Sequence, residues 1–323
     1  MTIPLWLSEA DVVSLLDVDT VIPTLRAGLP AEGTGALVNM AKTHASWGSH
    51  STLHALGAAF PAGGFVGTKT WAHTDKGASP LIILFDSEDG QVEAIIEAFA
   101  LGQMRTAGMS ALATDVLAAP DADVLGIIGT GKQALPQVEA VAAVRQLREV
   151  RVHGRDDARR MAMAAAVESR TGVPAVAVAT VEECVSDASI VTLATRATKW
   201  FLGAEHLRPG THLNAIGAIV PSRIEFEPAL LTRADVVAVD SVDQVRELSS
   251  EFRSYFAGDD DRWSRVRPLF ELLDGRRPNG SDLTVFKAMG LGAADVLIAV
   301  ACLCSARSES RGVPLPTAPF RRN

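Results

Sequence analysis

The sequence has few cysteines, and their scarcity excludes a fold held together by disulfides. Only Cys184, Cys302 and Cys304 occur among its 323 residues, too few and too scattered for a disulfide framework. Cys302 and Cys304 lie two apart in an expected helix, so they point to different faces and are poorly placed to share a metal ion. We expect both to be buried as small apolar side chains.

The sequence also lacks an excess of positive charge and a long apolar run. Its net charge is −8 and its pI is near 5.4, with no basic stripe, which disfavours a nucleic-acid partner. No apolar run reaches the roughly 18 residues that a membrane span needs, and residues 1–4 lack the features of a signal peptide. Because 48% of the residues are hydrophobic, a large core is feasible. We expect a cytoplasmic protein without membrane contact.

The first third of the chain shows the pattern of an antiparallel sheet. Ser8 and Asp17 are typical helix caps, and they predict two short helices, over residues 9–16 and up to residue 26. Short apolar or alternating runs follow, separated by Gly, Pro, Asp and Ser, with a hairpin turn at residues 86–90. The expected strands are residues 36–41, 52–58, 65–72, 81–85 and 91–96. A long helix of small residues, 101–118, closes this region.

After a hinge at residues 119–122, strands and helices alternate, which predicts a parallel, doubly wound sheet. The last helix, 293–305, is expected to return to the first domain. The predicted domains are therefore residues 1–118 together with 293–323, an antiparallel α+β domain, and residues 119–292. In the second domain we expect strands at 124–128, 150–153, 175–178, 190–194, 212–216 and 236–240, with helices at 133–147, 157–170 and 181–185.

A glycine turn follows the first strand of the second domain. The sequence Gly129-Thr130-Gly131-Lys132-Gln133-Ala134 has the form Gly-x-Gly-x-x-Ala between a strand and a helix. Glycines there allow the backbone to approach a pyrophosphate, whose charge the helix N-terminus stabilises. An ordinary strand-to-helix turn is the alternative. The turn predicts a dinucleotide-binding domain of the Rossmann type.

The end of the next strand bears on the choice of dinucleotide. Enzymes that use NAD commonly have an acidic residue there to hold the adenosine ribose. This chain has Gly154 at the tip, followed by Arg155 and Asp156. A guanidinium at Arg155 suits the 2′-phosphate of NADP, whereas Asp156 can reach the ribose or cap the next helix. The sequence slightly favours NADP, and NAD remains open.

Three cations stand out in the first domain: Lys42, Lys69 and Arg105. A lysine among buried strands is costly unless an anion partners it, although a snorkelling surface position is the alternative for each. If they converge, they would bind a carboxylate and influence proton transfer. His54, on a strand near them, is a candidate proton donor, with a structural role as the alternative. No metal-binding motif is present, so we expect no metal.

Three further stretches join the glycine turn in a family resemblance. They are residues 105–113, beginning Arg105-Thr106-Ala107, then His212-Leu213-Asn214-Ala215-Ile216-Gly217-Ala218, and Phe286-Lys287-Ala288-Met289-Gly290-Leu291. In this order the motifs resemble the ornithine cyclodeaminase/mu-crystallin family over about residues 5–305.

The resemblance implies a homodimer with a substrate-binding and dimerisation domain, a nicotinamide cofactor, and substrates that are amino acids or their imines. Lys69 matches the active-site lysine, Arg105 an arginine that holds the substrate carboxylate, and Met289 a position in the substrate wall. Lys42 stands where many members have a second carboxylate-binding arginine, and it lacks the bidentate fork. The matching cofactor residues are Lys132, Gln133, Thr195, Ile216, Gly217 and Arg223.

One position departs from the cyclodeaminases. They carry an aspartate just after the Gly-Ala or Gly-Gly pair of the motif that begins at His212, and in this chain Gly217-Ala218 is followed by Ile219. Since isoleucine transfers no proton, reduction of a preformed imine is favoured, for example of Δ1-pyrroline-2-carboxylate or iminosuccinate to an L-amino acid. One alternative is an ornithine or lysine cyclodeaminase in which Glu225 or Asp240 replaces the aspartate. Another is a protein of mu-crystallin type that binds NADPH and a small ligand.

Overall fold

A computed structural model describes residues 3–48, 51–275 and 277–316. The chain forms two compact units, one of residues 1–105 with 291–323 and the other of residues 106–290. The division falls inside helix α3 (Phe99–Leu117), whereas the sequence suggested a boundary after that helix. Parts of the predicted first domain, residues 1–2, 49–50 and 317–323, lie outside the described residues.

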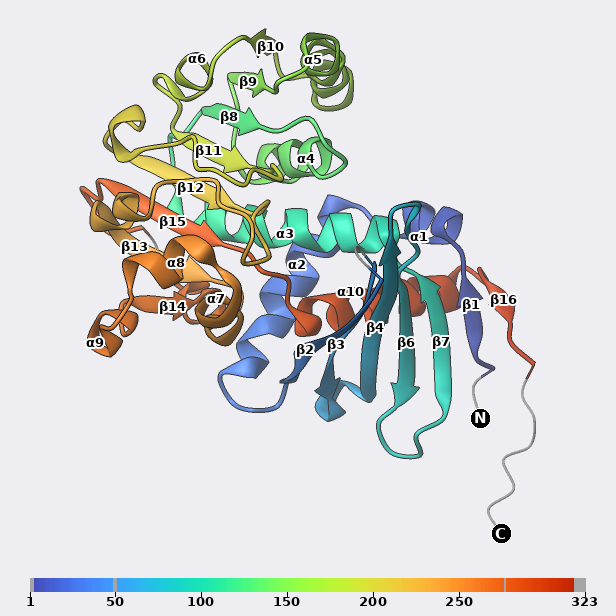
Figure 1. Ribbon diagram of the computed structural model, residues 1–323. Coiled ribbons are helices and arrows are strands. Elements are labelled where there is room, and N and C mark those ends of the chain that lie inside the picture. The colour runs from blue at the N-terminus through green and yellow to red at the C-terminus, as the bar shows by residue number, and fades with distance from the viewer. Residues whose placement is uncertain (1–2, 49–50, 276, 317–323) are drawn as a thin grey trace. The chain divides into compact units, whose positions relative to one another are not determined.

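The first unit contains an antiparallel-rich sheet, as predicted (Figure 1). Its strand order is β16-β1-β7-β6-β4-β3-β2, and β5 pairs with β4. Strand β1 joins β7 in parallel, a pairing that its three residues did not reveal. The strands are β1 (Leu5–Leu7), β2 (Val38–Trp47), β3 (Ser51–Phe60), β4 (Phe65–Thr74), β5 (Gly77–Ala78), β6 (Leu81–Asp86), β7 (Val92–Glu97) and β16 (Val313–Pro314).

Helix α10 (Gly292–Ser308) lies on one face of this sheet and forms part of the first unit. It packs on β2, β3, β4 and β6 and against α1 (Glu9–Leu15) and α2 (Val18–Gly28). The predicted caps are present, because Ser8 accepts a hydrogen bond from the Asp11 amide and Asp17 accepts one from Thr20. Short 3-10 turns complete the unit at Leu29–Glu32 and Pro61–Gly63.

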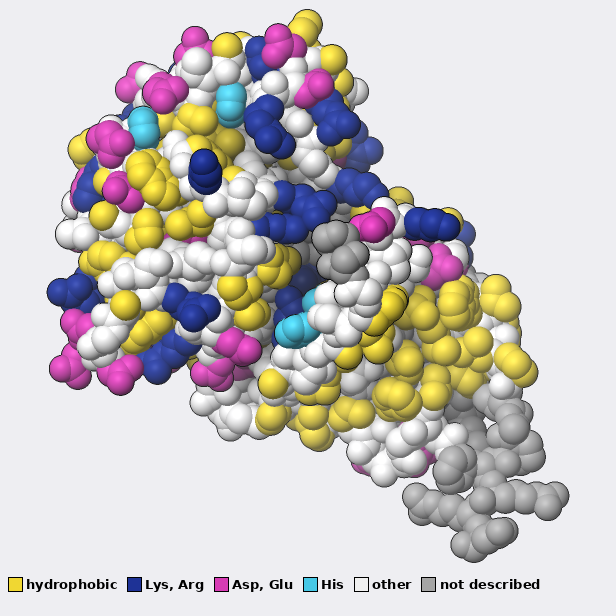
Figure 2. Space-filling model, in the orientation of Figure 1, with side chains coloured by type: hydrophobic (Ala, Val, Ile, Leu, Met, Phe, Trp, Pro, Cys, Tyr) yellow, Lys and Arg dark blue, Asp and Glu magenta, His cyan; other side chains and the backbone are white. Residues whose placement is uncertain are grey.

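The opposite face of this sheet is also apolar. Ile82 and Leu84 are buried on the α10 side, whereas Leu81, Ile83 and Phe85 alternate with them and are only half-buried. Ile95 pairs with Ile83 in the register. Hydrophobic side chains accordingly gather over β6 and β7 in Figure 2. A strand that is apolar on both faces is typical of a sheet with a layer on each side.

The second unit contains an eight-stranded sheet in which every strand pair is parallel. Its order, β10-β9-β8-β11-β12-β15-β13-β14, reverses direction between β8 and β11, which confirms the doubly wound prediction. The strands are β8 (Val124–Ile128), β9 (Glu149–His153), β10 (Ala175–Val178), β11 (Ile190–Leu193), β12 (Thr211–Ala215), β13 (Ala234–Val239), β14 (Val266–Pro268) and β15 (Leu283–Lys287).

Six helices of this unit connect or follow these strands: α4 (Ala134–Val144), α5 (Asp157–Thr171), α6 (Val181–Val185), α7 (Val242–Leu248), α8 (Ser250–Tyr255) and α9 (Asp260–Trp263). Short 3-10 turns occur at Ala204–His206, Pro228–Thr232 and Leu269–Leu272. The sequence did not predict β14, β15 or α7 to α9. Strand β15 escaped notice because polar Thr284 and Lys287 are buried in it and interrupt the apolar run.

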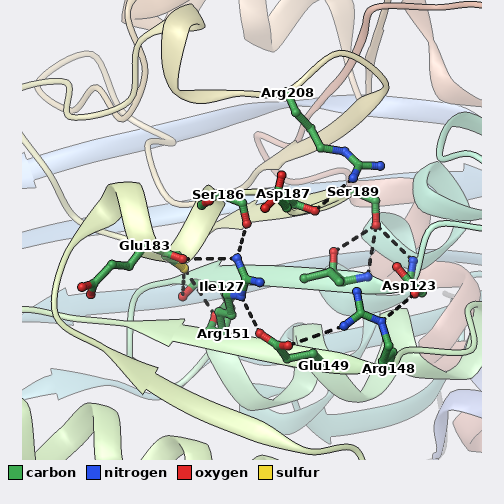
Figure 3. Close-up of polar contacts among 12 residues, drawn as sticks. Asp123, Ile127, Arg148, Glu149, Arg151, Glu183, Ser186, Asp187, Ser189 and Arg208 are labelled. Atoms are coloured by element: carbon green, nitrogen blue, oxygen red, sulfur yellow. Dashed lines mark hydrogen bonds and ion pairs between the residues drawn. The ribbon is translucent and has the colours of Figure 1, made fainter.

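Polar contacts join the loops at the amino ends of β8, β9 and β11 (Figure 3). The Ser189 hydroxyl accepts hydrogen bonds from the amides of Asp123 and Val124, at 3.0 and 3.1 Å. The Arg151 guanidinium donates to the Ser186 carbonyl and pairs with Glu149. These contacts connect the loops at the amino ends of the strands. The loops that carry the predicted cofactor residues follow the carboxyl ends of the strands.

The cysteine prediction is half right. Cys302 is buried, as is Cys184, but Cys304 is exposed, because two helical steps rotate it away from the face that α10 buries. The described part of the chain contains no cluster of potential metal ligands. None of its described helices is both long and apolar enough to cross a membrane.

Candidate active site

A buried ion-paired cluster in the first unit contains two of the predicted cations. Nζ of Lys69 on β4 lies 3.0 Å from Oδ1 of Asp295 on α10, and Nε of Arg105 on α3 lies 2.9 Å from the same oxygen. Asp295 is completely buried, and Lys69 is 8% exposed. The anion that a buried lysine requires is therefore a residue of this chain.

Three elements place these side chains together. The alternation of β4 directs Lys69 toward the face that α10 covers, and α3 leaves room for its ammonium at Gly102, where a β-carbon would lie 2.7 Å from Nζ. Sequence reasoning missed Asp295 because it is 226 positions from Lys69. A signal was present nonetheless, since Asp295 is an acidic residue within the otherwise apolar first half of α10.

The cluster shifts the titration of its members. Burial lowers the pKa of Lys69, Asp295 opposes this effect, and Arg105 adds to it. Burial by itself would raise the pKa of Asp295, but Arg105 and Lys69 hold it below its usual value. Oδ2 of Asp295 is buried and makes no hydrogen bond within the described chain. The carboxylate thus serves the two cations through a single oxygen.

His54 lies on the same face of the sheet as Lys69. Its ring stacks on Trp71, with centroids 4.7 Å apart, and the centroid of the Trp71 ring lies 5.9 Å from Nζ of Lys69. Nε2 of His54 lies 2.7 Å from the Thr52 hydroxyl. Burial, assisted by the charge of Lys42 on β2, lowers the pKa of His54 to about 4. His54 is therefore a neutral imidazole at neutral pH, and Lys42, half-buried, lies close enough to affect it electrostatically.

The glycine turn of the second unit has the geometry that a dinucleotide requires. Gly129 adopts a φ of +121°, and a β-carbon there would lie 2.5 Å from the Ala194 carbonyl, so no other residue fits. Gly131 and Lys132 are exposed, and the backbone of Gly131 is open to approach, since a β-carbon there would meet no atom within 4 Å. Helix α4 starts directly after Gln133. The turn therefore offers exposed backbone at a helix N-terminus, which fits a pyrophosphate.

The loop after β9 carries the residues from which the choice between NAD and NADP was predicted. A β-carbon at Gly154 would lie 2.7 Å from Cγ2 of Thr130, so a larger residue at the strand tip would require the Thr130 side chain to move. The Asp156 carboxylate accepts a hydrogen bond from the Arg159 amide and caps α5. Arg155 between them is exposed.

Glu225 holds together the two other loops in which cofactor residues were predicted. Its Oε1 accepts hydrogen bonds from the amide and hydroxyl of Thr195, both at 2.7 Å. Its Oε2 accepts from the amides of Gly217 and Ala218, both at 2.9 Å. Burial raises the pKa of Glu225, and Lys287 and these donors oppose the rise. The carboxylate connects the loop after β11 to the loop after β12.

A second polar layer supports this connection. Lys287, fully buried, donates to the Ala218 carbonyl at 2.7 Å and lies 3.7 Å from Oε1 of Glu251. The same Glu251 oxygen accepts from the Glu225 amide at 3.0 Å. The loop geometry is therefore fixed by buried charges of both signs, which are costly unless paired as they are here.

The remaining predicted residues occupy the same unit. Ile216 and Met289 are buried, and the Asp240 carboxylate accepts hydrogen bonds from the amides of Met289 and Gly290 at 2.7–2.9 Å. Arg223 is half-buried, and burial together with the charge of Arg196 lowers its pKa. Ile219 packs against the apolar core of the unit.

A doubly wound parallel sheet with a glycine turn at its first strand defines a dinucleotide-binding protein of the Rossmann class. The ion-paired cluster in the first unit adds a separate set of buried cations. The chain belongs to the ornithine cyclodeaminase/mu-crystallin family, whose sequence profile matches residues 6–309, and the family resemblance drawn from the motifs is confirmed.

Named relatives and a solved structure agree with this assignment. The chain is 30% identical over 228 residues to a Δ1-pyrroline-2-carboxylate reductase of Bacillus cereus, covering 69% of this chain and 70% of the relative. It is 31% identical over 219 residues to the ketimine reductase mu-crystallin of Mus musculus, covering 68% and 66%. The fold matches the Thermococcus litoralis Δ1-pyrroline-2-carboxylate reductase in complex with NADH and L-proline, with a TM-score of 0.91, 22% identity, and coverage of 96% and 100%.

Proposed function

We propose that this protein is a nicotinamide-dependent reductase that converts an imino acid into an L-amino acid. The observation that carries the proposal is that Ile219, on the loop after β12, packs against the core, while Glu225 and Asp240, the two carboxylates considered as replacements for the aspartate, are both engaged in hydrogen bonds. Glu225 accepts four hydrogen bonds, and Asp240 accepts bonds from two backbone amides. Neither carboxylate is left to exchange protons with a substrate amine, as cyclodeamination requires. Reduction of a preformed imine needs no such group.

The chemistry requires a hydride, a proton and an anchor for the substrate carboxylate. A reduced nicotinamide supplies the hydride to the imine carbon, and the nitrogen takes up one proton. Arg105 and Lys69 suit the carboxylate, because charge-assisted hydrogen bonds from buried cations are strong. Lys69 is also the better proton donor, since His54 is neutral at neutral pH. Lys42 adds positive charge on the same face of the sheet, and Met289 is proposed as part of the substrate wall.

The dinucleotide sites are proposed from the second unit alone. Gly129, Thr130, Gly131, Lys132 and Gln133 form the turn for the pyrophosphate. Thr195, Ile216, Gly217 and Arg223 lie on the two loops that Glu225 connects, and they are proposed to line the nicotinamide end. We further propose that NADPH is preferred to NADH, because Gly154 supplies no carboxylate at the strand tip, Asp156 is engaged as a helix cap, and Arg155 is exposed.

The substrate and the assembly are also proposals. The relatives' names point to cyclic ketimines such as Δ1-pyrroline-2-carboxylate, and the surplus of cations keeps an acyclic dicarboxylate such as iminosuccinate as a candidate. A homodimer is supported by the apolar outer face of the first unit's sheet, where Leu81, Ile83, Phe85 and Ile95 are incompletely buried. A cytoplasmic location remains a prediction.

The decisive assay follows NADH and NADPH oxidation with Δ1-pyrroline-2-carboxylate, and with pyruvate, glyoxylate or oxaloacetate in the presence and absence of ammonia or methylamine. Oxidation that requires the imine supports the proposal. Ammonia release from ornithine without any keto acid would instead identify a cyclodeaminase. Tight NADPH binding with no oxidation across the panel would identify a binding protein of the mu-crystallin type.

The role of Lys69 has its own test. Lys69→Ala should reduce imine turnover by roughly 10²- to 10⁴-fold, the usual contribution of a general acid, while leaving dinucleotide affinity unchanged. Turnover at the wild-type rate would remove Lys69 from the mechanism.

A further inference from the structure

Asp295 stands out because a single buried oxygen serves two cations that come from different elements. Oδ1 is 3.0 Å from Nζ of Lys69 and 2.9 Å from Nε of Arg105. The donors arise from β4 and α3, and the acceptor from α10. Because the three segments lie far apart in the sequence, this contact fixes the directions of both cationic side chains at once.

The arrangement also solves an electrostatic problem. Two buried positive charges repel each other, and burial alone favours the uncharged form of a lysine. The charged groups that act on Lys69 are Asp295, Arg105 and, from α1, Glu9. Glu9 accepts hydrogen bonds from the amides of Phe99 and Ala100, so Asp295 is the carboxylate in direct contact with the ammonium.

The groups on neighbouring strands do not replace this contact. At neutral pH Lys42 on β2 is cationic and His54 on β3 is neutral. On β6, Ile82 pairs with Lys69 in the register. Arg105 and Lys69 in turn lower the pKa of Asp295 and keep it charged. The negative charge that stabilises the Lys69 ammonium therefore comes chiefly from Asp295.

We propose that Asp295 is a positioning residue of the reductase, which keeps the Lys69 ammonium charged and directed and orients Arg105 through its Nε while the two Nη groups remain for a substrate carboxylate. This inference rests on the proposed function for its catalytic meaning. Its structural content, the control of the Lys69 charge by Asp295, is independent of any substrate. If Asp295 loses its negative charge, Lys69 should lose its proton at a lower pH.

The direct test is a titration of Lys69. The protein is labelled with ¹³C at lysine Cε, the Lys69 signal is assigned by its loss in Lys69→Arg, and its chemical shift is followed against pH. Asp295→Asn keeps the shape of the side chain and removes its charge, so it should lower the midpoint by at least about one pH unit, a tenfold change in the protonation equilibrium. The control Asp86→Asn removes the charge of a half-buried carboxylate at the end of β6, which accepts hydrogen bonds from the amides of Glu88 and Asp89, and it should leave the midpoint unchanged. Equal midpoints in wild type and Asp295→Asn would overturn the proposal.

The pH dependence of turnover provides the functional test. In Asp295→Asn, kcat/KM for the imine should fall at least about tenfold more at the alkaline end of the profile than near pH 6. In Lys69→Arg, the arginine keeps its charge throughout this pH range. Adding Asp295→Asn to Lys69→Arg should therefore lower activity without displacing the pH profile of kcat/KM. A displacement of the same size in that double variant would show that Asp295 does not act through Lys69.

A variant that fails to fold does not leave the inference untested. Arg105→Gln removes the opposing positive charge, so it should raise the Lys69 midpoint in the same titration, and an unchanged midpoint would contradict the proposed charge balance. Failure of the wild type to reduce any imine would refute the proposed function alone. The titration result would then still decide whether Asp295 controls Lys69.

Discussion

Gly102 and Lys69 compete for one space in the first unit, since a β-carbon at position 102 would lie 2.7 Å from Nζ of Lys69. Gly102 lies inside α3, where glycine is less favourable than alanine by roughly 1 kcal/mol. Helix propensity therefore opposes the residue found there, and the space for the ammonium explains its presence. The ion pair with Asp295 depends on a residue that has no side chain.

Gly102→Ala should lower activity by disturbing the ion pair of Lys69 with Asp295. The new methyl group displaces the ammonium from Asp295, so we expect kcat/KM to fall at least about tenfold, a loss of roughly 1.4 kcal/mol of transition-state stabilisation. The thermal midpoint should also fall, because separating the buried ion pair costs more than the roughly 1 kcal/mol that alanine adds to the stability of the helix. Gly28→Ala is the matched control, since it crowds Leu297 of α10 instead of the lysine. Wild-type kinetics in Gly102→Ala would show that Lys69 tolerates displacement.

Glu225→Gln should weaken dinucleotide binding more than it alters the chemical step. The amide has one acceptor oxygen for four donors, and its NH₂ group faces N–H groups that need an acceptor. Leaving a buried donor unpaired costs about 1–3 kcal/mol, so the free energy of unfolding should fall by about that amount. The dissociation constant of NAD(P)H, followed by protein fluorescence, should rise with little change in kcat at saturating cofactor.

The neighbouring Glu227→Gln serves as the control for Glu225→Gln and should behave like the wild type. Ammonia-lyase activity that disappears in Glu225→Gln would instead mean that this carboxylate exchanges protons with a substrate.

Local features were predictable from the sequence, and long-range charge pairing was not. The turn at Gly129 could be recognised because its glycines, the preceding strand and the following helix are adjacent in the chain. Asp295 and Lys69 are 226 positions apart, and no pattern along the chain indicates which acidic residue reaches a given lysine. Glu225 was considered as a proton carrier, but only its four hydrogen bonds identify its structural role. Lys287 concealed β15, because a buried lysine contradicts the apolar pattern of a central strand.

Arg155→Ala should alter the choice of dinucleotide. If the guanidinium contacts the 2′-phosphate, its removal should lower kcat/KM with NADPH by about tenfold. A charge-assisted hydrogen bond contributes roughly 1.5–3 kcal/mol, and an exposed one contributes less. Activity with NADH, which lacks that phosphate, should be unchanged. The assay measures both cofactors at one imine concentration, with Arg159→Ala on the exposed face of α5 as the control. An equal loss with both cofactors would contradict a role in 2′-phosphate recognition.

Ile83→Lys should disrupt the proposed homodimer. Ile83 lies on the outer face of the first unit's sheet, half-buried between β4 and β7, and a lysine there would bring an unpaired charge into an apolar interface. Light scattering should show a dimer for the wild type and a monomer for the variant at the same concentration. Thr68→Ser, at the position paired with Ile83, is the conservative control. A monomeric wild type would refute the dimer without affecting the proposed chemistry.

Acid should destabilise the second unit through His212. This residue is fully buried between Thr284 and Asn214, with ring contacts of 2.9 and 3.2 Å, and burial lowers its pKa to about 3 from 6.5. Between these two pH values His212 is protonated in the unfolded chain but stays neutral in the folded protein, so the free energy of unfolding falls as the pH falls. From pH 7 to pH 5 the loss from this group should be about 2 kcal/mol. His212→Gln should be less stable at pH 7 but should lose less stability on acidification, as measured by urea unfolding at both pH values. The exposed His44→Gln is the control and should retain the wild-type pH dependence; an identical dependence in His212→Gln would assign the acid sensitivity to other groups.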